Sequence, residues 1–246
     1  MRSPIRLFAD DCVIYRNIED RNDAEKLQTD LNTLDKWQQT WQMSFNASKC
    51  FLLRITHKTN PIYVDYKIGE DILQQTQSHS YLGVELTQDL KWNTHVNNIT
   101  AKANRQLGFI KRNLLSCPKD LKAKAFITLV RPLLEYSSSV WDTYTGELTK
   151  QIESVQRRAA RFVMRDYSRY SSPSTMMASL DWDSLESRRK INRLALMHKI
   201  TNNQAAVPVE TFLQPVTRPT RNQNNKAYQR PAGKKDCWVY SYFLQQ

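Results

Sequence analysis

The stretch Ile5-Arg-Leu-Phe-Ala-Asp-Asp-Cys-Val-Ile-Tyr15 does most to decide how this chain is interpreted. Two short runs of apolar, β-branched or aromatic residues flank the carboxylate pair Asp10-Asp11, a pattern that predicts a β-hairpin with both acids at its tip. Two acids at a tight turn repel each other, and a hard divalent cation would neutralise that repulsion. An ordinary aspartate-rich turn is the alternative, which the dipeptide alone would favour.

The residues that follow this hairpin predict a mixed α and β region ending near residue 92. Asn22 with Glu25 matches a capping box, and the apolar residues after it recur every three or four positions, which predicts a helix of about five turns. A Gly69-Glu70 turn separates two of the strand-like stretches that come next. The predicted strands are 50–55, 62–64, 66–68, 71–73 and 81–86. Residues 1–92 are therefore expected to be α+β.

Beyond Trp92 the apolar periodicity becomes that of helices. A single apolar stripe runs from an Asn93/Thr94 cap to Leu114. Residues 204–246 carry prolines and basic residues among Asn and Gln, and predict an extended basic tail of low helix content. Between Leu114 and the tail, helices are expected at 119–141, 147–166 and 184–201. The first should be bent or broken near Pro132, and the last should follow an Asp183/Glu186 capping box.

The composition excludes several classes of protein. With five glycines in 246 residues, the 28.9 kDa chain does not fit a propeller or a glycine-rich nucleotide loop. The cysteines form no C-x-x-C pair, so zinc-ribbon and disulfide-framework interpretations have no local support. No apolar run approaches the roughly 20 residues needed to cross a bilayer, and the N-terminus lacks the apolar core of a secretory signal. We therefore expect an intracellular protein, nuclear or cytoplasmic, with no membrane partner.

The formal charge of +12 is unevenly distributed along the chain. Residues 1–100 carry 11 basic and 13 acidic side chains, whereas residues 101–246 carry 25 and 11, a net charge of +14. The second half is therefore expected to meet polyanions. Arg158, Arg161 and Arg165 are spaced to share one helix face, where guanidinium groups could follow a phosphate backbone; a solvated face is the alternative.

The segment Phe8-Ala-Asp-Asp11 resembles motif C of reverse transcriptases, in the form found in jockey-type LINE (non-LTR) retrotransposons. Asn46–Cys50 resembles motif D of that family, and Tyr81–Val84 followed by Leu90–Trp92 resembles motif E, the primer grip. The resemblance continues, in order, through nearly the whole chain. Its later parts are 130–141, 152–162 and 185–200, which resemble the helical thumb and the segment after it, and 240–243, which resembles a motif further on.

The resemblance implies an RNA-directed DNA polymerase with an RNA template, a DNA primer and dNTP as partners. Asp10 and Asp11 would be catalytic carboxylates that bind Mg²⁺ for two-metal nucleotidyl transfer. Lys49 would be a general acid or a point charge for the pyrophosphate, and a solvated turn lysine is the alternative. The residues that would contact the primer are Tyr81, Leu82 and Gly83, for which a strand with a close backbone approach at the glycine is the alternative.

The same resemblance implies a partial polymerase palm followed by a mainly α-helical thumb and connection region. The family takes another metal-binding acid from motif A, well before motif C, yet none of the nine residues before Asp10 is Asp or Glu. We therefore expect a C-terminal fragment starting at motif C, with weak or absent Mg²⁺ binding and no activity alone. The expected domains are the C-terminal part of the palm at 1–92, the thumb and post-polymerase helices at 93–203, and the basic tail at 204–246. A non-catalytic nucleic-acid-binding remnant is the alternative function, and the oligomeric state stays open.

Overall fold

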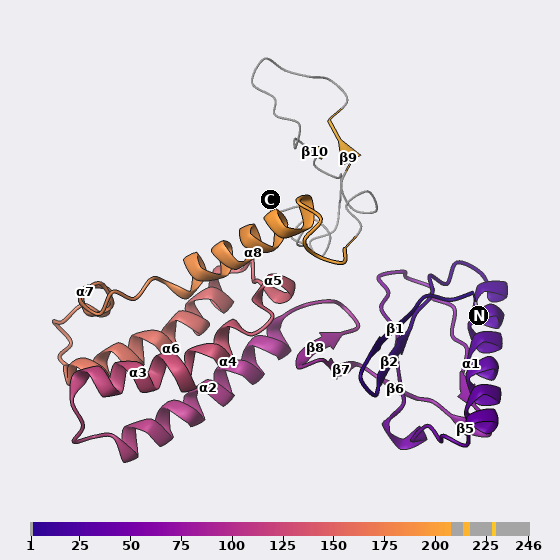
Figure 1. Ribbon diagram of the computed structural model, residues 1–246, viewed down its shortest axis with the longest axis horizontal. Coiled ribbons are helices and arrows are strands. Elements are labelled where there is room, and N and C mark those ends of the chain that lie inside the picture. The colour runs from indigo at the N-terminus through magenta and orange to yellow at the C-terminus, as the bar shows by residue number, and fades with distance from the viewer. Residues whose placement is uncertain (1, 208–213, 217–227, 230–246) are drawn as a thin grey trace. The chain divides into compact units, whose positions relative to one another are not determined.

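The computed structural model describes residues 2–207, 214–216 and 228–229 of the chain. It divides into two compact units, Met1–Leu90 (unit 1) and Lys91–Gln246 (unit 2) (Figure 1). Unit 1 combines a long helix with short strands, and unit 2 is mainly helical, which confirms the expected α+β class. Most of the tail predicted at 204–246 lies outside the described residues.

Unit 1 is built from short two-stranded sheets beside one long helix. Three antiparallel hairpins, β1 with β2, β4 with β5 and β7 with β8, accompany a parallel pair of β3 with β6. The helices are α1 (Arg21–Trp41) and the 3₁₀ turn η1 (Ala47–Lys49). The strands are β1 (Ile5–Phe8), β2 (Asp11–Ile14), β3 (Phe51–Leu53), β4 (Lys67–Ile68), β5 (Asp71–Ile72), β6 (Gln74–Thr76), β7 (Ser78–Tyr81) and β8 (Val84–Thr87).

The core of unit 1 lies under the apolar face of α1. Ala24, Leu27 and Leu31, spaced three and four residues apart, are buried together with Tyr66 from the segment before β4. The predicted Asn22/Glu25 capping box is wrong, because the N-cap is Asp20, whose extended backbone lets its side chain accept a hydrogen bond from the Asp23 N–H.

Two of the strand predictions in unit 1 are wrong for identifiable reasons. The strand expected at 81–86 is interrupted, because Leu82 (φ 48°) and Gly83 (φ 79°) form a two-residue hairpin turn between β7 and β8. No strand forms at 62–64, where the Arg54 guanidinium takes the carbonyl oxygens of Ile62 and Val64 that a strand ladder would need. The predicted turn at Gly69-Glu70 is confirmed, with Gly69 at φ 59°.

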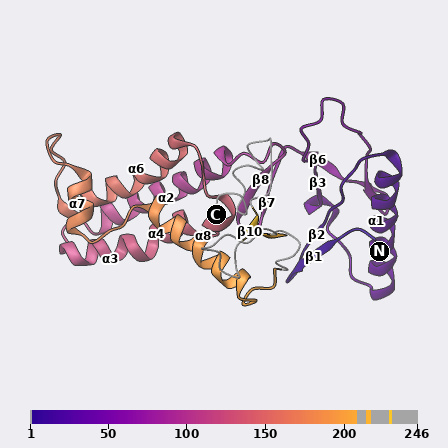
Figure 2. The same cartoon turned by 90° about the horizontal axis from the view of Figure 1, so that it is seen from above.

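Unit 2 is a group of helices around α6. This helix contacts α2, α3, α7 and α8, and its buried face includes Ile152, Val155, Ala159 and Phe162 (Figure 2). A short antiparallel pair, β9 (Gln214–Pro215) with β10 (Tyr228–Gln229), lies beyond them in the chain. The helices are α2 (Asn93–Asn113), α3 (Lys119–Leu129), α4 (Arg131–Glu135), α5 (Ser138–Trp141), α6 (Gly146–Met164), α7 (Pro173–Ser179) and α8 (Leu185–Thr201).

The helices of unit 2 follow the predicted periodicity, but their caps do not. The break near Pro132 is confirmed, since α3 ends at Leu129 and Pro132 lies in the first turn of α4. α2 begins without a side-chain cap from Asn93 or Thr94, and α8 is capped by Ser184, which accepts from the Ser187 N–H, rather than by Asp183. Among the helices described, none combines the length and the apolar character needed to span a membrane.

Candidate functional site

The carboxylate pair lies at the tip of the hairpin formed by β1 and β2, as predicted. Phe8 pairs with Asp11 across the hairpin, so Ala9 and Asp10 form the two-residue loop and Asp11 begins β2. Ala9 has a left-handed backbone (φ 49°), a conformation that costs a residue with a Cβ about 1–2 kcal/mol. Both aspartates are exposed, and no described side chain or backbone N–H bonds either carboxylate. The fold therefore presents two unsatisfied anionic groups to solvent.

The base of this hairpin is held by a buried carboxylate on α1. Asp30 is 3 % exposed and accepts backbone hydrogen bonds from Arg2 (2.8 Å) and Ser3 (2.6 Å). Burial raises the pKa of Asp30, but hydrogen bonds from Ser3 and from the two backbone N–H groups outweigh it and leave the pKa below its usual value. The hairpin is thus anchored at its open end while its acidic tip stays in solvent.

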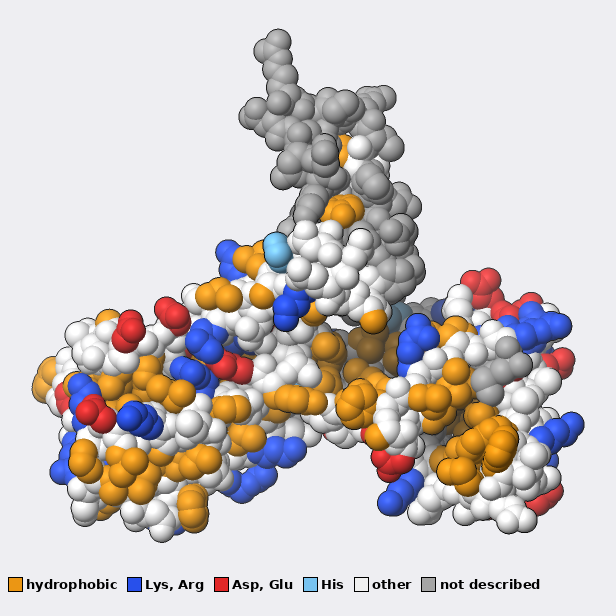
Figure 3. All heavy atoms as spheres, viewed as in Figure 1, with side chains coloured by type: hydrophobic (Ala, Val, Ile, Leu, Met, Phe, Trp, Pro, Cys, Tyr) orange, Lys and Arg blue, Asp and Glu red, His pale blue; other side chains and the backbone are white. Residues whose placement is uncertain are grey.

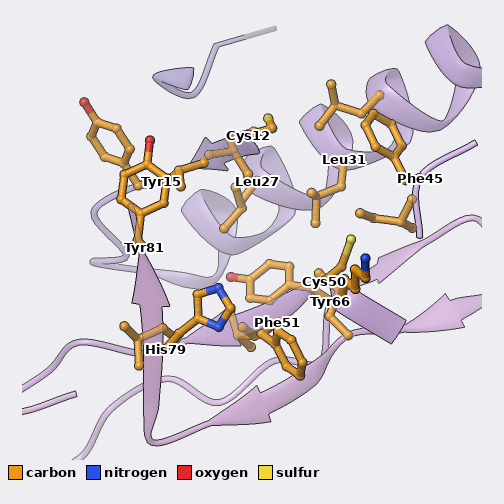
Figure 4. Close-up of a pocket in the computed structure, with 18 of the residues that line it drawn as sticks. Cys12, Tyr15, Leu27, Leu31, Phe45, Cys50, Phe51, Tyr66, His79 and Tyr81 are labelled. Atoms are coloured by element: carbon orange, nitrogen blue, oxygen red, sulfur yellow. The ribbon is translucent and has the colours of Figure 1, made fainter. Parts of the chain in front are cut away.

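A cavity of about 320 Å³ lies within unit 1, lined mainly by apolar side chains from β2, α1, β3 and β7. Figure 4 shows Cys12 and Tyr15 from the hairpin region facing this space together with Leu27 from α1 and His79 and Tyr81 from β7. Lys49 also lines it. The structure therefore brings together two of the predicted site residues, Lys49 and Tyr81, whereas Asp10, Asp11, Leu82 and Gly83 are not part of the lining.

Lys49 is the last residue of η1. The Asn46 side chain caps this turn by accepting from the Ser48 N–H, and the Lys49 N–H donates to the Asn46 carbonyl at 2.9 Å. The backbone of Lys49 is therefore fixed while its side chain is exposed. That arrangement suits a positioned charge at the cavity, and it equally suits a solvated turn lysine.

Tyr81, Leu82 and Gly83 lie at the turn between β7 and β8. Tyr81 is half-buried at the end of β7, and the two residues after it form the turn. His79 and Tyr81, two residues apart, share the face of β7 that lines the cavity, and the His79 ring lies 5.1 Å from that of Phe51. His79 and Phe51 were not predicted as site residues from the sequence. The period of two in β7 was the available signal for His79.

The three predicted phosphate-binding arginines do not form one free row. Arg158 is exposed on α6 and bonds Ser154 one turn earlier. Arg161 donates to the carbonyls of Ser168 and Ser171, and Arg165 donates to the carbonyl of Leu115 at 2.5 Å. Arg165 also lies outside the helix, because it is the C-cap of α6 in a left-handed conformation (φ 54°). The expectation that all three share one helix face is wrong for Arg165.

The second group of basic residues, on α8, is engaged in ion pairs. Arg188 bonds Glu135 of α4, while Arg189 Nε lies 2.7 Å and Arg193 Nη1 2.8 Å from the two carboxylate oxygens of Asp142. Arg189 is completely buried. These arginines therefore bind α8 to the neighbouring helices.

The chain is similar in sequence to RNA-directed DNA polymerases of Drosophila transposons. The chain is 24% identical over 238 residues to a probable RNA-directed DNA polymerase from transposon BS of Drosophila melanogaster, which covers 92% of the chain and 25% of that relative. It is also 23% and 26% identical to RNA-directed DNA polymerases from the mobile element jockey of Drosophila melanogaster and Drosophila funebris, over 64% of the chain and 18% of each relative. The chain is a homologue of transposon RNA-directed DNA polymerases.

The aligned region is a large share of this chain but a small share of each relative. The similarity to the transposon BS relative extends over most of this chain and includes both units. This chain, however, spans only about a quarter of the length of that relative and less than a fifth of the length of the jockey relatives. No family model and no solved structure matches the chain.

Proposed function

We propose that this chain is part of the RNA-directed DNA polymerase of a non-LTR retrotransposon and that Asp10 and Asp11 bind its divalent metal ions. The observation that carries the proposal is the exposed carboxylate pair at the hairpin tip, without internal partners, in a chain whose homologues are RNA-directed DNA polymerases. Carboxylate oxygens are the ligands that Mg²⁺ prefers in proteins. A carboxylate pair that no described residue neutralises is chemically suited to a divalent cation.

The two carboxylates fit Mg²⁺ as part of its ligand set. Mg²⁺ takes about six oxygen ligands and usually keeps several waters or substrate phosphates. Within the described residues, no group of three or more His, Cys, Asp or Glu side chains is placed to hold an ion. Asp10 and Asp11 would therefore share the ion with water, nucleotide phosphate or other protein groups. When bound, Mg²⁺ supplies Lewis-acid stabilisation of the attacking hydroxyl and the leaving pyrophosphate in nucleotidyl transfer.

Lys49 and the turn after β7 would serve the substrates of the same reaction. Lys49, with its backbone fixed by η1 and its side chain exposed, would stabilise the charge of the pyrophosphate or donate a proton to it. Tyr81, Leu82 and Gly83 would contact the DNA primer. The RNA template, the primer and dNTP are accordingly the partners that we propose.

A second candidate function is nucleic-acid binding without catalysis, which the charge of unit 2 supports. Residues 101–246 carry a net charge of +14. On the face visible in Figure 3, Lys and Arg side chains of this unit are interspersed with hydrophobic ones. Burial, and then the Arg158 guanidinium, lower the pKa of Lys111 on the adjacent α2. Two cations held this close would be stabilised by an anion such as a backbone phosphate.

Metal binding is tested on the 246-residue chain by Mn²⁺ titration with water-proton relaxation as the readout. We expect weak binding, on the order of 1 mM, because two carboxylates supply only part of the ligand set. Asp10→Asn and Asp11→Asn should each weaken it, and Asp71→Asn, which changes an exposed acid of another hairpin, should not. Equal binding by all three variants would exclude the acid pair as the metal site.

Nucleic-acid binding is tested by the salt dependence of affinity for a short DNA duplex. Changing Arg158, Arg161 and Arg165 together to Gln should flatten the slope of log K against log salt by roughly 2–3, and Arg158→Gln alone by about 0.9. Lys36→Gln on α1 is the charge-matched control in unit 1. A slope that the arginine changes leave untouched would assign them to structure alone. Arginine-dependent binding without metal binding would favour the non-catalytic function.

A further inference from the structure

Lys122 is a buried cation for which the described residues provide no anionic partner. It lies in α3, its side chain is 1 % exposed, and its Nζ lies 5.1 Å from the centroid of the Phe162 ring. No described carboxylate or carbonyl bonds its ammonium group. Burying a charge without a paired counter-charge is costly, and an aromatic face compensates only part of that cost. Lys122 therefore occupies a position that an anion would stabilise.

Lys122 lines a pocket of about 360 Å³ within unit 2. Three basic side chains, those of Lys119, Lys122 and Arg165, contribute to its wall, and no Asp or Glu does. Burial lowers the pKa of Lys122, and the Arg165 guanidinium lowers it further, although the Cys117 thiol opposes this. The lowered pKa therefore reflects the burial of the ammonium group first and the like charge of Arg165 second, and no carboxylate lines the pocket to offset either effect.

The pocket also includes the N-terminus of α3. Pro118 is the N-cap, provides no side-chain hydrogen bond, and accepts the first helical bond from the Lys122 N–H. The N–H groups of the first turn, residues 119–121, therefore have no partner within the helix, and the helix dipole adds partial positive charge there. Asp120 lies in this turn but does not line the pocket.

Arg165 is held in place independently of any ligand. Its left-handed backbone ends α6, and its Nη2 donates to the Leu115 carbonyl at the end of α2. That bond uses one of the five N–H donors of a guanidinium group. Arg165 also lines the pocket, and its charge is close enough to Lys122 to lower the pKa of that ammonium group.

We propose that this pocket binds a phosphate group, with Lys122 at its buried end and Arg165, Lys119 and the first turn of α3 around it. A phosphate dianion matches several converging cationic donors and a helix N-terminus better than a single carboxylate does. The phosphate could belong to a nucleic-acid backbone or to a free phosphate compound. The site itself does not depend on the polymerase proposal, since failure of catalysis would leave it unchanged.

Inorganic phosphate is the probe for the first experiment, at constant ionic strength with chloride as the reference anion. The readout is the rate at which neutral iodoacetamide alkylates Cys117, measured by peptide mass spectrometry, because Cys117 lines the pocket. Phosphate should slow alkylation of Cys117 in a saturable way and leave the exposed Cys12 unaffected. No saturable protection, or equal protection of both cysteines, would overturn the proposal.

Variants of α3 separate binding from folding. Lys122→Met keeps the length of the side chain and removes its charge, and should weaken phosphate binding about tenfold or more. Lys124→Met, the same change at an exposed position of α3 outside the pocket, should alter it less than twofold. Lys119→Gln, at the exposed rim, should weaken it about threefold and serves if Lys122→Met does not fold. Equal affinities in the Lys119 and Lys124 variants would contradict the proposal.

A second arm identifies the source of the phosphate. A short DNA duplex is added at low salt while protection of Cys117 by inorganic phosphate is measured. Because a phosphodiester in the pocket would itself shield Cys117, the duplex is also tested without inorganic phosphate; protection by the duplex alone that disappears in Lys122→Met supports the site with a backbone phosphodiester as its ligand. Phosphate protection that the duplex does not change supports it with a free phosphate compound as its ligand.

Discussion

Asp142→Asn tests whether the arginines of α8 hold unit 2 together. Asp142 lies between Arg189 and Arg193, with N···O distances of 2.7 and 2.8 Å. The Arg189 side chain is fully buried, and its Nη1 and Nη2 have no hydrogen-bond partner among the described residues. Removing the carboxylate charge would leave this guanidinium buried without a counter-charge.

The expected loss of stability is large. Removing one partner of a buried ion pair costs about 3–5 kcal/mol. With a urea dependence of about 1.5 kcal/mol per M, the unfolding midpoint should fall by about 2–3 M. Arg189→Met removes the buried charge itself and leaves Asp142 paired with Arg193. Its cost should therefore be about 1 kcal/mol or less, well below that of Asp142→Asn.

Urea unfolding followed by far-UV circular dichroism and tryptophan fluorescence measures both variants, since Trp141 is fully buried next to Asp142 in the chain. Asp120→Asn makes the same chemical change at an exposed position and should shift the free energy of unfolding by no more than about 0.5 kcal/mol. If Asp142→Asn behaves like Asp120→Asn, or Arg189→Met costs as much as Asp142→Asn, the buried ion pair does not have the structural role assigned to it.

Three further outcomes are expected. The pKa of Asp30 is lowered in the folded chain, so its stabilising effect is complete above the ordinary aspartate pKa of about 4 and is lost as the pH falls through the folded pKa. The amide-exchange protection of β1 should therefore decrease below about pH 4. Asp30→Asn should show low protection at every pH. Ala9→Gly should stabilise the hairpin by about 1 kcal/mol in thermal unfolding because Ala9 has a φ of 49°, and a lower melting temperature would contradict that strain. The isolated 246-residue chain should extend no primer with Mg²⁺ or Mn²⁺, and dNTP incorporation that Asp10→Ala abolishes would refute this.

The elements that the sequence predicted well are those with a long or symmetric local signal. α2 and α6 carry apolar stripes over about five turns, and both are found where the periodicity placed them. The hairpin around Asp10 is found because two short runs of strand-forming residues flank a tight turn. α7 was missed because its seven residues are too few for a periodic pattern to emerge.

The errors occurred where neighbouring side chains compete for the same backbone group. Asp20 and Asn22 are both good caps, and the structure uses Asp20 for α1, just as it uses Ser184 rather than Asp183 for α8. The sequence predicted that Arg161 and Arg165 would be available to bind phosphate. Both instead donate to carbonyl groups in loops, and no local sequence pattern predicts the course of those loops. The burial of Lys122 had a local signal, since Ala125 and Phe126 lie three and four residues further along the same face.

RNA-templated primer extension by a chimeric enzyme tests most directly whether Asp10 and Asp11 serve a polymerase. This chain replaces the matching segment of the jockey polymerase of Drosophila melanogaster, and dNTP incorporation is measured with Mg²⁺. We expect the chimera to extend the primer, Asp10→Asn to lower the rate about 100-fold or more, Asp11→Asn to lower it less, and Asp71→Asn to leave it unchanged. A folded chimera that extends no primer, or one whose rate Asp10→Asn does not change, would contradict the account.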